Sequence, residues 1–164
     1  MSFSAFTTKF AGISNKLVSK DTKIRYMGRM SRPLFALWDT GATRTCVSEE
    51  VAKELELIPT GKEIINTPSG SSNQNTYLID LLLPNGVVIG EMMILDAKIG
   101  NQKIDMLIGM DVITLGDFSV SNNNGKTYFT FRIPSQKHID FCSEGRLNNI
   151  IGKTHGKGNK KRKK

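Results

Sequence analysis

The sequence predicts an all-β, barrel-like domain with one or two short helices. Short runs of aliphatic, aromatic and β-branched residues recur along the chain, and residues that favour turns separate them. The clearest helical pattern is brief and follows Ser48. The chain has 164 residues, of which 38% are hydrophobic, so one domain can bury a core of its own.

Four strands are expected before that helix. Alternating side chains predict the first, and apolar or β-branched runs predict the other three. The expected strands are 3–13, 22–27, 34–38 and 45–47. Polar and turn-forming residues at 15–21 and 28–33 predict the connections between them.

A short helix is expected after the fourth strand. The Ser48 hydroxyl can cap its first turn, and the two glutamates that follow suit the positive end of the helix dipole. Val51 and Leu55, four residues apart, give this helix one apolar face. Pro59 and Gly61 are expected to end it.

The second half of the chain continues the pattern of strands and turns. Asn85-Gly86 is a strong hairpin signal, and residues 121–125 mark a last hairpin. One or two helical turns are expected at 111–115, and a polar loop at 67–75. The expected strands are 63–66, 76–83, 87–89, 91–95, 104–108, 118–120 and 127–133.

The apolar run at 34–38 leads directly into Asp39-Thr40-Gly41. A carboxylate at the end of a buried strand is costly unless it is paired or hydrogen-bonded, so Asp39 requires an explanation. Asp and Gly both favour turns, and an isolated Asp-Thr-Gly tripeptide is more often a turn than a catalytic site. The residues on both sides of the tripeptide decide between the two interpretations.

The segment Leu37-Trp38-Asp39-Thr40-Gly41-Ala42 resembles the active-site motif of the retropepsin-like aspartic proteases, which include retroviral, stand-alone bacterial and DNA-damage-inducible eukaryotic members. A second family element, an apolar pair followed by Gly and a short helix, is matched by Asp105–Ile113. Its Gly109 follows Asp39 by 70 positions (109 − 39). The resemblance covers roughly residues 21–134.

The resemblance implies a closed β-barrel of the acid protease fold and an aspartic endopeptidase that cleaves extended polypeptides. Asp39, Thr40 and Gly41 would be the catalytic residues. Because the chain holds one Asp-Thr-Gly, two copies would form a symmetric homodimer in which the two Asp39 side chains meet. Two carboxyl groups that share one proton can activate water without a cofactor or a metal.

The resemblance also implies which residues contact substrate. Ala42 and Ile108 would lie near the floor of the cleft. In the family, a hairpin called the flap folds over bound substrate, and here it would include Thr67, Pro68, Ser69 and Gly70. Composition alone favours an ordinary exposed loop at 67–75, so the position of this segment after the helix carries the flap interpretation.

Asp111 competes with Asp39 for a catalytic role. It lies at an expected helix start, where an acid is favoured by exposed N–H groups, so we interpret it as structural and expect Arg44 as its partner. Trp38 is expected in the core or the cleft wall. Asp105 and Asp117 lie near turns and are expected to be solvated.

Other kinds of site find little support. Cys46 and Cys142 are expected to be buried structural thiols, and with His138 and His155 they show no zinc-ligand spacing. His138 is expected to be exposed. The sequence has no Gly-x-Ser-x-Gly elbow and no phosphate-binding glycine loop with a lysine.

The charge is concentrated at the C-terminus. The net charge is +8, but residues 1–152 hold 16 basic and 15 acidic side chains, and seven cations lie within 153–164. We therefore expect a protease domain at 1–135 and a basic, disordered tail at 136–164. The tail would either solubilise the protein or bind nucleic acid and other polyanions, and the composition favours neither.

That tail is the basis of the alternative function, a nucleic-acid-associated or peptide-binding protein that reuses the protease fold. No membrane association is expected, because no apolar run is long enough to span a bilayer. The N-terminus lacks the continuous apolar core of a secretion signal, so a cytoplasmic location is expected. Met1 lies close to the first expected strand, so no folded prodomain is expected before it.

Overall fold

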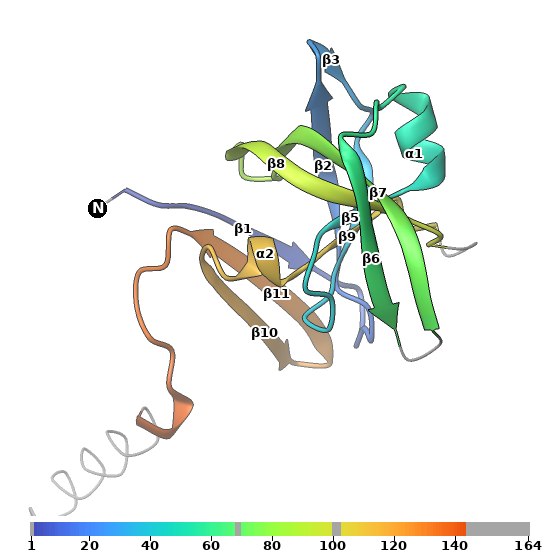
Figure 1. Cartoon of the computed structure of the whole chain (residues 1–164). Helices are drawn as coiled ribbons and strands as arrows, with labels where there is room; N and C mark the ends of the chain where they lie inside the picture. The colour runs from blue at the N-terminus through green and yellow to red at the C-terminus, as the bar shows by residue number, and fades with distance from the viewer. Residues whose placement is uncertain (1, 68–69, 100–102, 144–164) are drawn as a thin grey trace, which may run out of the picture.

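The computed structural model describes residues 2–67, 70–99 and 103–143 (Figure 1). The chain forms a β-barrel and a separate three-stranded sheet. The barrel strands are β2 (Val18–Tyr26), β3 (Arg29–Met30), β4 (Leu34–Trp38), β5 (Cys46–Ser48), β6 (Gly61–Thr67), β7 (Gly70–Leu82), β8 (Val88–Ala97) and β9 (Met106–Ile108). The three-stranded sheet has the order β1 (Ser4–Lys9), β11 (Lys126–Ile133), β10 (Asp117–Asn123).

An extra pairing closes the larger sheet. Its strand order is β3-β2-β4-β9-β5-β8-β7-β6, and β2 also pairs with β7. The register of that pairing sets Lys23 against Leu82 and Arg25 against Asp80. Because β2 and β7 lie on opposite sides of the order, their pairing makes a closed barrel, which confirms the predicted all-β fold.

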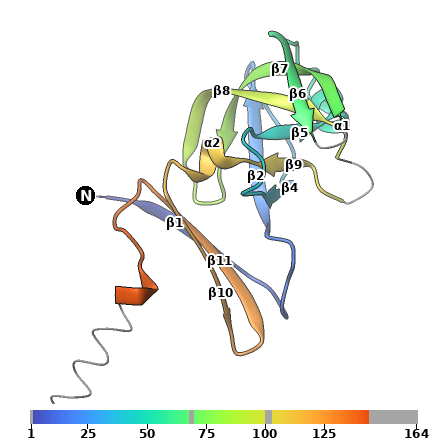
Figure 2. The same ribbon diagram turned by 60° about the horizontal axis from the view of Figure 1, so that its bottom comes forward.

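The core is one cluster that runs from α1 through the barrel interior to the face on which the three-stranded sheet packs. Figures 1 and 2 show that sheet on one side of the barrel and α1 (Glu49–Glu54) at the far end. Trp38, at the end of β4, is 3% exposed and stacks on Phe118, with ring centroids 5.8 Å apart. The Trp38 ring also contacts Phe131 at 4.9 Å, and its Nε1 donates to the buried Ser19 hydroxyl. Trp38 therefore lies in the core, which is one of the two locations predicted for it.

The helices α1 and α2 (Met110–Ile113) begin close to where they were predicted, but α1 ends at Glu54, well before Pro59 and Gly61, because the chain turns at Leu55 and Glu56, where Glu56 has φ of 51°. Ser48 precedes α1, and its hydroxyl accepts a hydrogen bond from the Val51 N–H at 3.2 Å. The second helix, α2, begins one residue before the predicted stretch and stops short of residue 115. No helix in the described ranges is long and apolar enough to cross a bilayer.

Several predicted boundaries are wrong, and each error has a local cause. The strand β2 begins at Val18, four residues before its predicted start, because a bulge between Ser19 and Thr22 lets the polar segment stay paired with β4. The predicted loop at 28–33 contains β3, joined to β2 by a tight turn in which Met27 and Gly28 have φ of 47° and 79°. The single strand β8 replaces two predicted strands.

The predicted loop at 67–75 is the largest correction. Residues 70–75 belong to β7, which pairs with β6 from Gly61–Thr76 to Thr67–Gly70. Backbone hydrogen bonds form this hairpin. Its side chains are polar because they face solvent, which the sequence alone does not distinguish from a loop. The Asn85-Gly86 turn is confirmed, with φ of 80° at Gly86.

Of the two thiols, Cys46 is buried as predicted, and burial raises its pKa to about 11. Cys142 is exposed, so the prediction of a buried thiol is wrong there. It lies after the last strand, where little chain packs around it. His138 is exposed, as predicted.

Candidate active site

Asp39 lies where two parallel strands end side by side. In β4 and β9, Ala36 is paired with Met106 and Trp38 with Ile108. The Asp39 N–H continues this pairing by donating to the Ile108 carbonyl at 2.9 Å. Asp39 is thus the first residue after the buried strand β4, which is paired with β2 on one side and β9 on the other.

The next residues fold back onto the Asp39 carboxylate. The Gly41 N–H donates to Asp39 Oδ1 at 2.8 Å, and the Ala42 N–H donates to the Asp39 carbonyl at 3.2 Å. A Cβ at position 41 would lie 3.1 Å from Asp39 Oδ1, so close approach to the carboxylate favours glycine there. Thr40 and Gly41 are exposed and Asp39 is half-buried, so the motif faces outward at the surface of one chain.

Gly109 holds the other side of this loop. Its N–H donates to Thr45 Oγ1 at 3.1 Å, and the Met110 N–H donates to the Ala42 carbonyl at 2.8 Å. A Cβ at Gly109 would lie 2.7 Å from the Arg44 carbonyl carbon. The backbone of residues 42–45 therefore crosses directly over Gly109, which explains the glycine that follows the apolar pair.

Asp111 fixes the same loop and does not point a free carboxylate at the surface. Its two oxygens accept from the Thr45 N–H at 2.8 Å and the Thr45 hydroxyl at 2.7 Å. Oδ1 also accepts from the Val112 N–H at 3.0 Å. The predicted pairing with Arg44 is wrong, because Thr45, which the sequence did not single out, takes that place.

Arg44 instead joins the loop to the β6–β7 hairpin. Its Nη2 lies 3.2 Å from Glu63 Oε2 on β6. The strand facing the site is therefore β6, through the side that carries Glu63 and, two residues further, Ile65.

The predicted site residues that the structure describes lie in two places, the strands and loop around Asp39 and the end of the β6–β7 hairpin. Ala42 is half-buried, and Ile108 is fully buried, so Ile108 meets Asp39 through its carbonyl while its side chain fills the core. Thr67 and Gly70 are paired at the end of the hairpin, and Gly70 has φ of 128°. Pro68 and Ser69 lie outside the described residues.

Two other carboxylates are corrected by the structure. Asp105 accepts from Arg32 Nη2 at 2.7 Å and from the Phe35 N–H at 2.8 Å. Burial acts to raise the pKa of Asp105, but the Arg32 and Phe35 hydrogen bonds outweigh it and hold this pKa below its ordinary value. The prediction that Asp105 is solvated is therefore wrong.

Asp117 is also bound and not solvated. Hydrogen bonds from the Ser135 hydroxyl, the Gln136 N–H and the Arg132 guanidinium lower the pKa of Asp117. These donors come from the end of β11 and the residues after it. Asp117 therefore ties the start of β10 to the end of the domain, far from Asp39 in sequence and in a different sheet.

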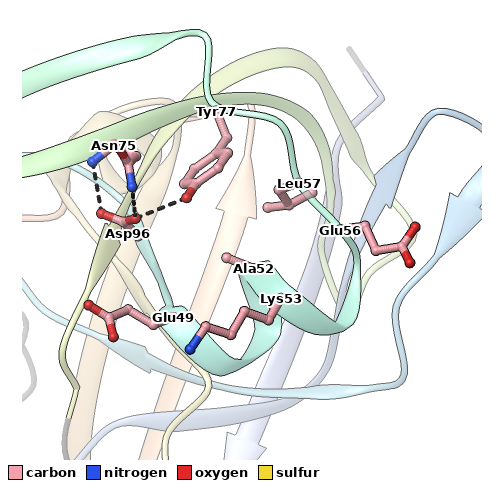
Figure 3. Close-up of a pocket in the computed structure, with 8 residues that line it drawn as sticks. All are labelled: Glu49, Ala52, Lys53, Glu56, Leu57, Asn75, Tyr77 and Asp96. Carbon is pink, nitrogen blue, oxygen red and sulfur yellow. Dashed lines mark hydrogen bonds between the residues drawn. The ribbon is translucent and has the colours of Figure 1, made fainter.

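A cavity of about 480 Å³ lies beside α1, and Asp39 does not line it (Figure 3). Inside it, Asp96 accepts from the Asn75 N–H at 2.9 Å, from Asn75 Nδ2 at 2.8 Å and from the Tyr77 hydroxyl at 2.9 Å. Burial, helped by the bond to Asp96, raises the pKa of Tyr77 to about 12. These bonds occupy the Asp96 carboxylate and join β7 to β8, so we assign them to the framework.

The described residues do not include a cluster of metal-ligating side chains. In the described part of the chain, no three His, Cys, Asp or Glu side chains are grouped closely enough to hold an ion. Unlike Asp111, which accepts three hydrogen bonds, Asp39 is held by the Gly41 N–H at the outer end of β4 and β9.

Several solved structures are similar to this chain. A retropepsin-like aspartic protease from Rickettsia conorii is 12% identical, with a TM-score of 0.51, over 81% of this chain and 97% of that one. EIAV protease, complexed with the inhibitor HBY-793, is 18% identical over 62% of this chain and 88% of its own, with a TM-score of 0.47. Simian foamy virus (mac) protease is 24% identical over 58% of this chain and 89% of its own, with a TM-score of 0.41. A search of curated protein sequences found no match.

A match to a family model shows the family of this chain. The family described as aspartyl protease matches residues 24–112, more than half of the chain. That range begins in β2, includes the Asp39 loop and the β6–β7 hairpin, and ends in α2. The fold is retropepsin-like, and the chain belongs to the aspartyl protease family.

Proposed function

We propose that the protein is an aspartic endopeptidase that acts as a homodimer, with Asp39 of each copy forming the catalytic pair. One observation carries the proposal. The Asp39 carboxylate is held by the Gly41 N–H at the outer end of β4, beside the exposed residues Thr40 and Gly41. A carboxylate in that position is fixed on one side and open on the other.

Two such carboxylates, brought together and sharing one proton, supply both the base and the acid that peptide hydrolysis requires. The ionised carboxylate takes a proton from water, whose oxygen attacks the carbonyl carbon of the peptide. The protonated carboxyl gives its proton to the amide nitrogen, and the carbon–nitrogen bond then breaks. The pair titrates as a unit, so no separate pKa belongs to either copy of Asp39.

The homodimer follows from the count of motifs. The chain holds a single Asp-Thr-Gly, so the second carboxylate must come from a second copy. Thr40 is exposed next to Asp39, where its hydroxyl can hydrogen-bond across a twofold axis. The Ala42 carbonyl accepts from the Met110 N–H, so its backbone is fixed, and its methyl group would leave space beside this axis.

The substrate would be an extended polypeptide between the floor and the β6–β7 hairpin. The Arg44–Glu63 contact supports this proposal, because it turns one side of β6 toward the loop after Asp39, and the period of a strand adds Ile65 to that side. Residues 67–70 would close over the substrate as the flap. An extended chain between two sheet surfaces presents alternate side chains to alternate pockets.

Active-site titration tests the proposal. Cleavage of a mixed peptide library between about pH 3 and 8 is expected to fall at both ends of the range, because both the base and the acid of the pair must be present. A tight-binding statine-type inhibitor is expected to abolish cleavage at one molecule per two chains. A folded dimer that cleaves no peptide at any of these pH values, or full inhibition only at one molecule per chain, would contradict it.

A further inference from the structure

We propose that the outer face of the three-stranded sheet binds single-stranded nucleic acid, with Phe3 and Tyr128 stacking on bases and Lys9 contacting phosphate. This face belongs to a different sheet from the Asp39 loop, so the site does not depend on the proposed protease activity. Three observations support it. They are the side chains on the outer face, two pairs of an aromatic ring and a cation among them, and the distribution of charge along the chain.

The two faces of the sheet differ in character. The inner face is aromatic, and its Phe6, Phe129 and Phe131 belong to the core or pack against it. Side chains alternate along a strand, so the residues between these phenylalanines lie on the opposite face. Along β1, the residues just before it and β11, this outer face carries Phe3, Thr7, Lys9, Lys126, Tyr128 and Arg132.

Two aromatic rings on the outer face each lie beside a cation. Lys9 is directly opposite Tyr128 in the pairing of β1 with β11, and its Nζ is 5.7 Å from the centroid of the Tyr128 ring. The guanidinium carbon of Arg132 is 5.5 Å from the centroid of the Phe3 ring, and Phe3 is 53% exposed. An open ring beside a cation suits a nucleotide, because the base can stack on the ring while the cation meets the phosphate.

The spacing of the two pairs suits a short single strand. Tyr128 and Arg132 are four residues apart on β11, which separates the two pairs by about 13 Å. Between them lie Thr7 and Thr130, which are opposite each other and whose hydroxyls are 3.1 Å apart. RNA-binding modules built on a β-sheet stack two or three bases on the aromatic residues of the sheet. A strand of that length can therefore run from one pair to the other over small side chains.

The sheet is the basic part of the folded chain. Residues 2–17 and 116–143, which form it, hold five basic and two acidic side chains, a net charge of +3. Residues 18–115, which form the barrel, hold ten basic and twelve acidic side chains, a net charge of −2. A chain of phosphates is attracted to the first part and repelled by the second.

The cations of the outer face are not all taken up by carboxylates. Arg132 is paired with Asp117. Among the described residues, however, neither Lys9 nor Lys126 has a carboxylate within ion-pair distance. These two lysines can therefore meet phosphate without breaking an ion pair of the protein.

The sheet supplies what the basic C-terminal segment lacks. Seven cations lie within 153–164, but the chain has no Phe, Tyr or Trp after Phe141. That segment can contact phosphates, whereas stacking requires aromatic rings. The rings of the sheet therefore favour nucleic acid over polyanions without bases, such as heparin.

The experiment uses the full chain and two fluorescent probes of equal charge, an oligomer of about ten thymidines and an abasic oligomer of the same length. In fluorescence anisotropy, the wild type is expected to bind the thymidine oligomer at least about fivefold more tightly, the effect of stacking one base. Phe3→Leu and Tyr128→Leu should each reduce this ratio and leave the affinity for the abasic oligomer nearly unchanged.

The barrel offers a matched control. Phe35 on β4 is 42% exposed, and Lys20 Nζ lies 5.9 Å from the centroid of its ring. Phe35→Leu should leave the ratio unchanged. Lys9→Gln should weaken binding of both oligomers and lower the slope of log affinity against log salt by about 0.7, the value for one phosphate contact on a single strand. Lys20→Gln should do neither.

Photo-cross-linking locates the site even if Tyr128→Leu fails to fold. An oligomer that contains 5-bromouracil, cross-linked to the wild-type chain and mapped by mass spectrometry, is expected to join Phe3 or Tyr128. Equal binding of the two oligomers by the wild type would show a contact with phosphate only and would overturn the proposal. So would an equal loss in Phe35→Leu and Tyr128→Leu, or cross-links confined to residues 144–164.

Discussion

Thr45 shows how a residue without chemistry of its own can hold the loop that follows Asp39. It is fully buried, and its N–H and hydroxyl both donate to Asp111, while its oxygen accepts from the Gly109 N–H. Loss of a buried hydrogen bond of this kind costs about 1–3 kcal/mol when the partner is left unsatisfied. Asp111, Thr45 and Gly109 therefore fix the backbone on which Asp39 depends.

Gly109→Ala is expected to destabilise the protein by about 1–3 kcal/mol, because the new methyl would lie 2.7 Å from the Arg44 carbonyl carbon and push the loop away. Gly12→Ala is the matched control, since nothing lies within 4 Å of a Cβ there. It should be neutral or stabilise by about 0.4–1 kcal/mol through the unfolded chain. Urea unfolding measures both. Equal stability of the two variants would show that the loop does not cross Gly109 this closely.

At the scale of the elements, local pattern predicted some boundaries well. The strand β4 has the predicted bounds because Pro33 and Asp39 flank a continuous apolar run. Ser48 caps α1 as expected, because a cap needs only the residues that follow it. The same reasoning missed the strand at residues 70–75. Backbone pairing with β6 forms that strand, and its sequence has no periodic apolar pattern.

Contacts between distant residues could not be predicted from local pattern either. Asp105 meets Arg32 across 73 positions, and Arg44 meets Glu63 on a different element. The sequence indicated Asp39 and Gly109 through motif resemblance, but it gave no signal for Thr45 or for the Asp96 cluster. A side chain's partner depends on which strands become neighbours, and that is a property of the closed barrel.

The Asp105 contact predicts a loss of stability in acid. Its pKa in the folded protein is lowered, so its contribution is present above the unfolded-state pKa of about 4 and is lost as pH falls through the folded-state value. Wild type should therefore exceed Asp105→Asn in urea midpoint at pH 6, and the difference should shrink below about pH 4. Glu50→Gln, an exposed acid in α1, is the control. A constant difference from pH 6 to pH 2.5 would contradict the assignment.

The β6–β7 hairpin should respond to ligand as a lid. Binding of a peptide-like inhibitor is expected to slow amide hydrogen exchange in Ile65, Asn66, Ser71 and Ser72, because an extended ligand would pack under these paired residues. The β10–β11 hairpin is the internal reference, since it belongs to the other sheet. Exchange that stays unchanged in β6 and β7 under saturating inhibitor would remove the flap assignment.

At the scale of the whole molecule, charge is separable from the barrel. Seven cations lie within 153–164, whereas residues 1–152 are nearly neutral. Deleting Lys153–Lys164 is therefore expected to weaken binding to heparin or RNA and to flatten its dependence on salt, because fewer counterions are released. Cleavage of a short neutral peptide should be unaffected. If a folded, dimeric truncation no longer cleaves that peptide, the domain boundary at 135 is wrong.

The central claim concerns one carboxylate, and specific activity per folded dimer tests it most directly. Asp39→Asn keeps the shape of the side chain and an oxygen for the Gly41 N–H, but it removes the titrating proton that the pair must share. Asp111→Asn is the comparison, because it disturbs the bonds to Thr45 and lowers the amount of folded dimer. With dimer content measured by sedimentation, Asp39→Asn should show no detectable cleavage, whereas Asp111→Asn should keep wild-type activity per dimer. Wild-type cleavage by Asp39→Asn would contradict the account.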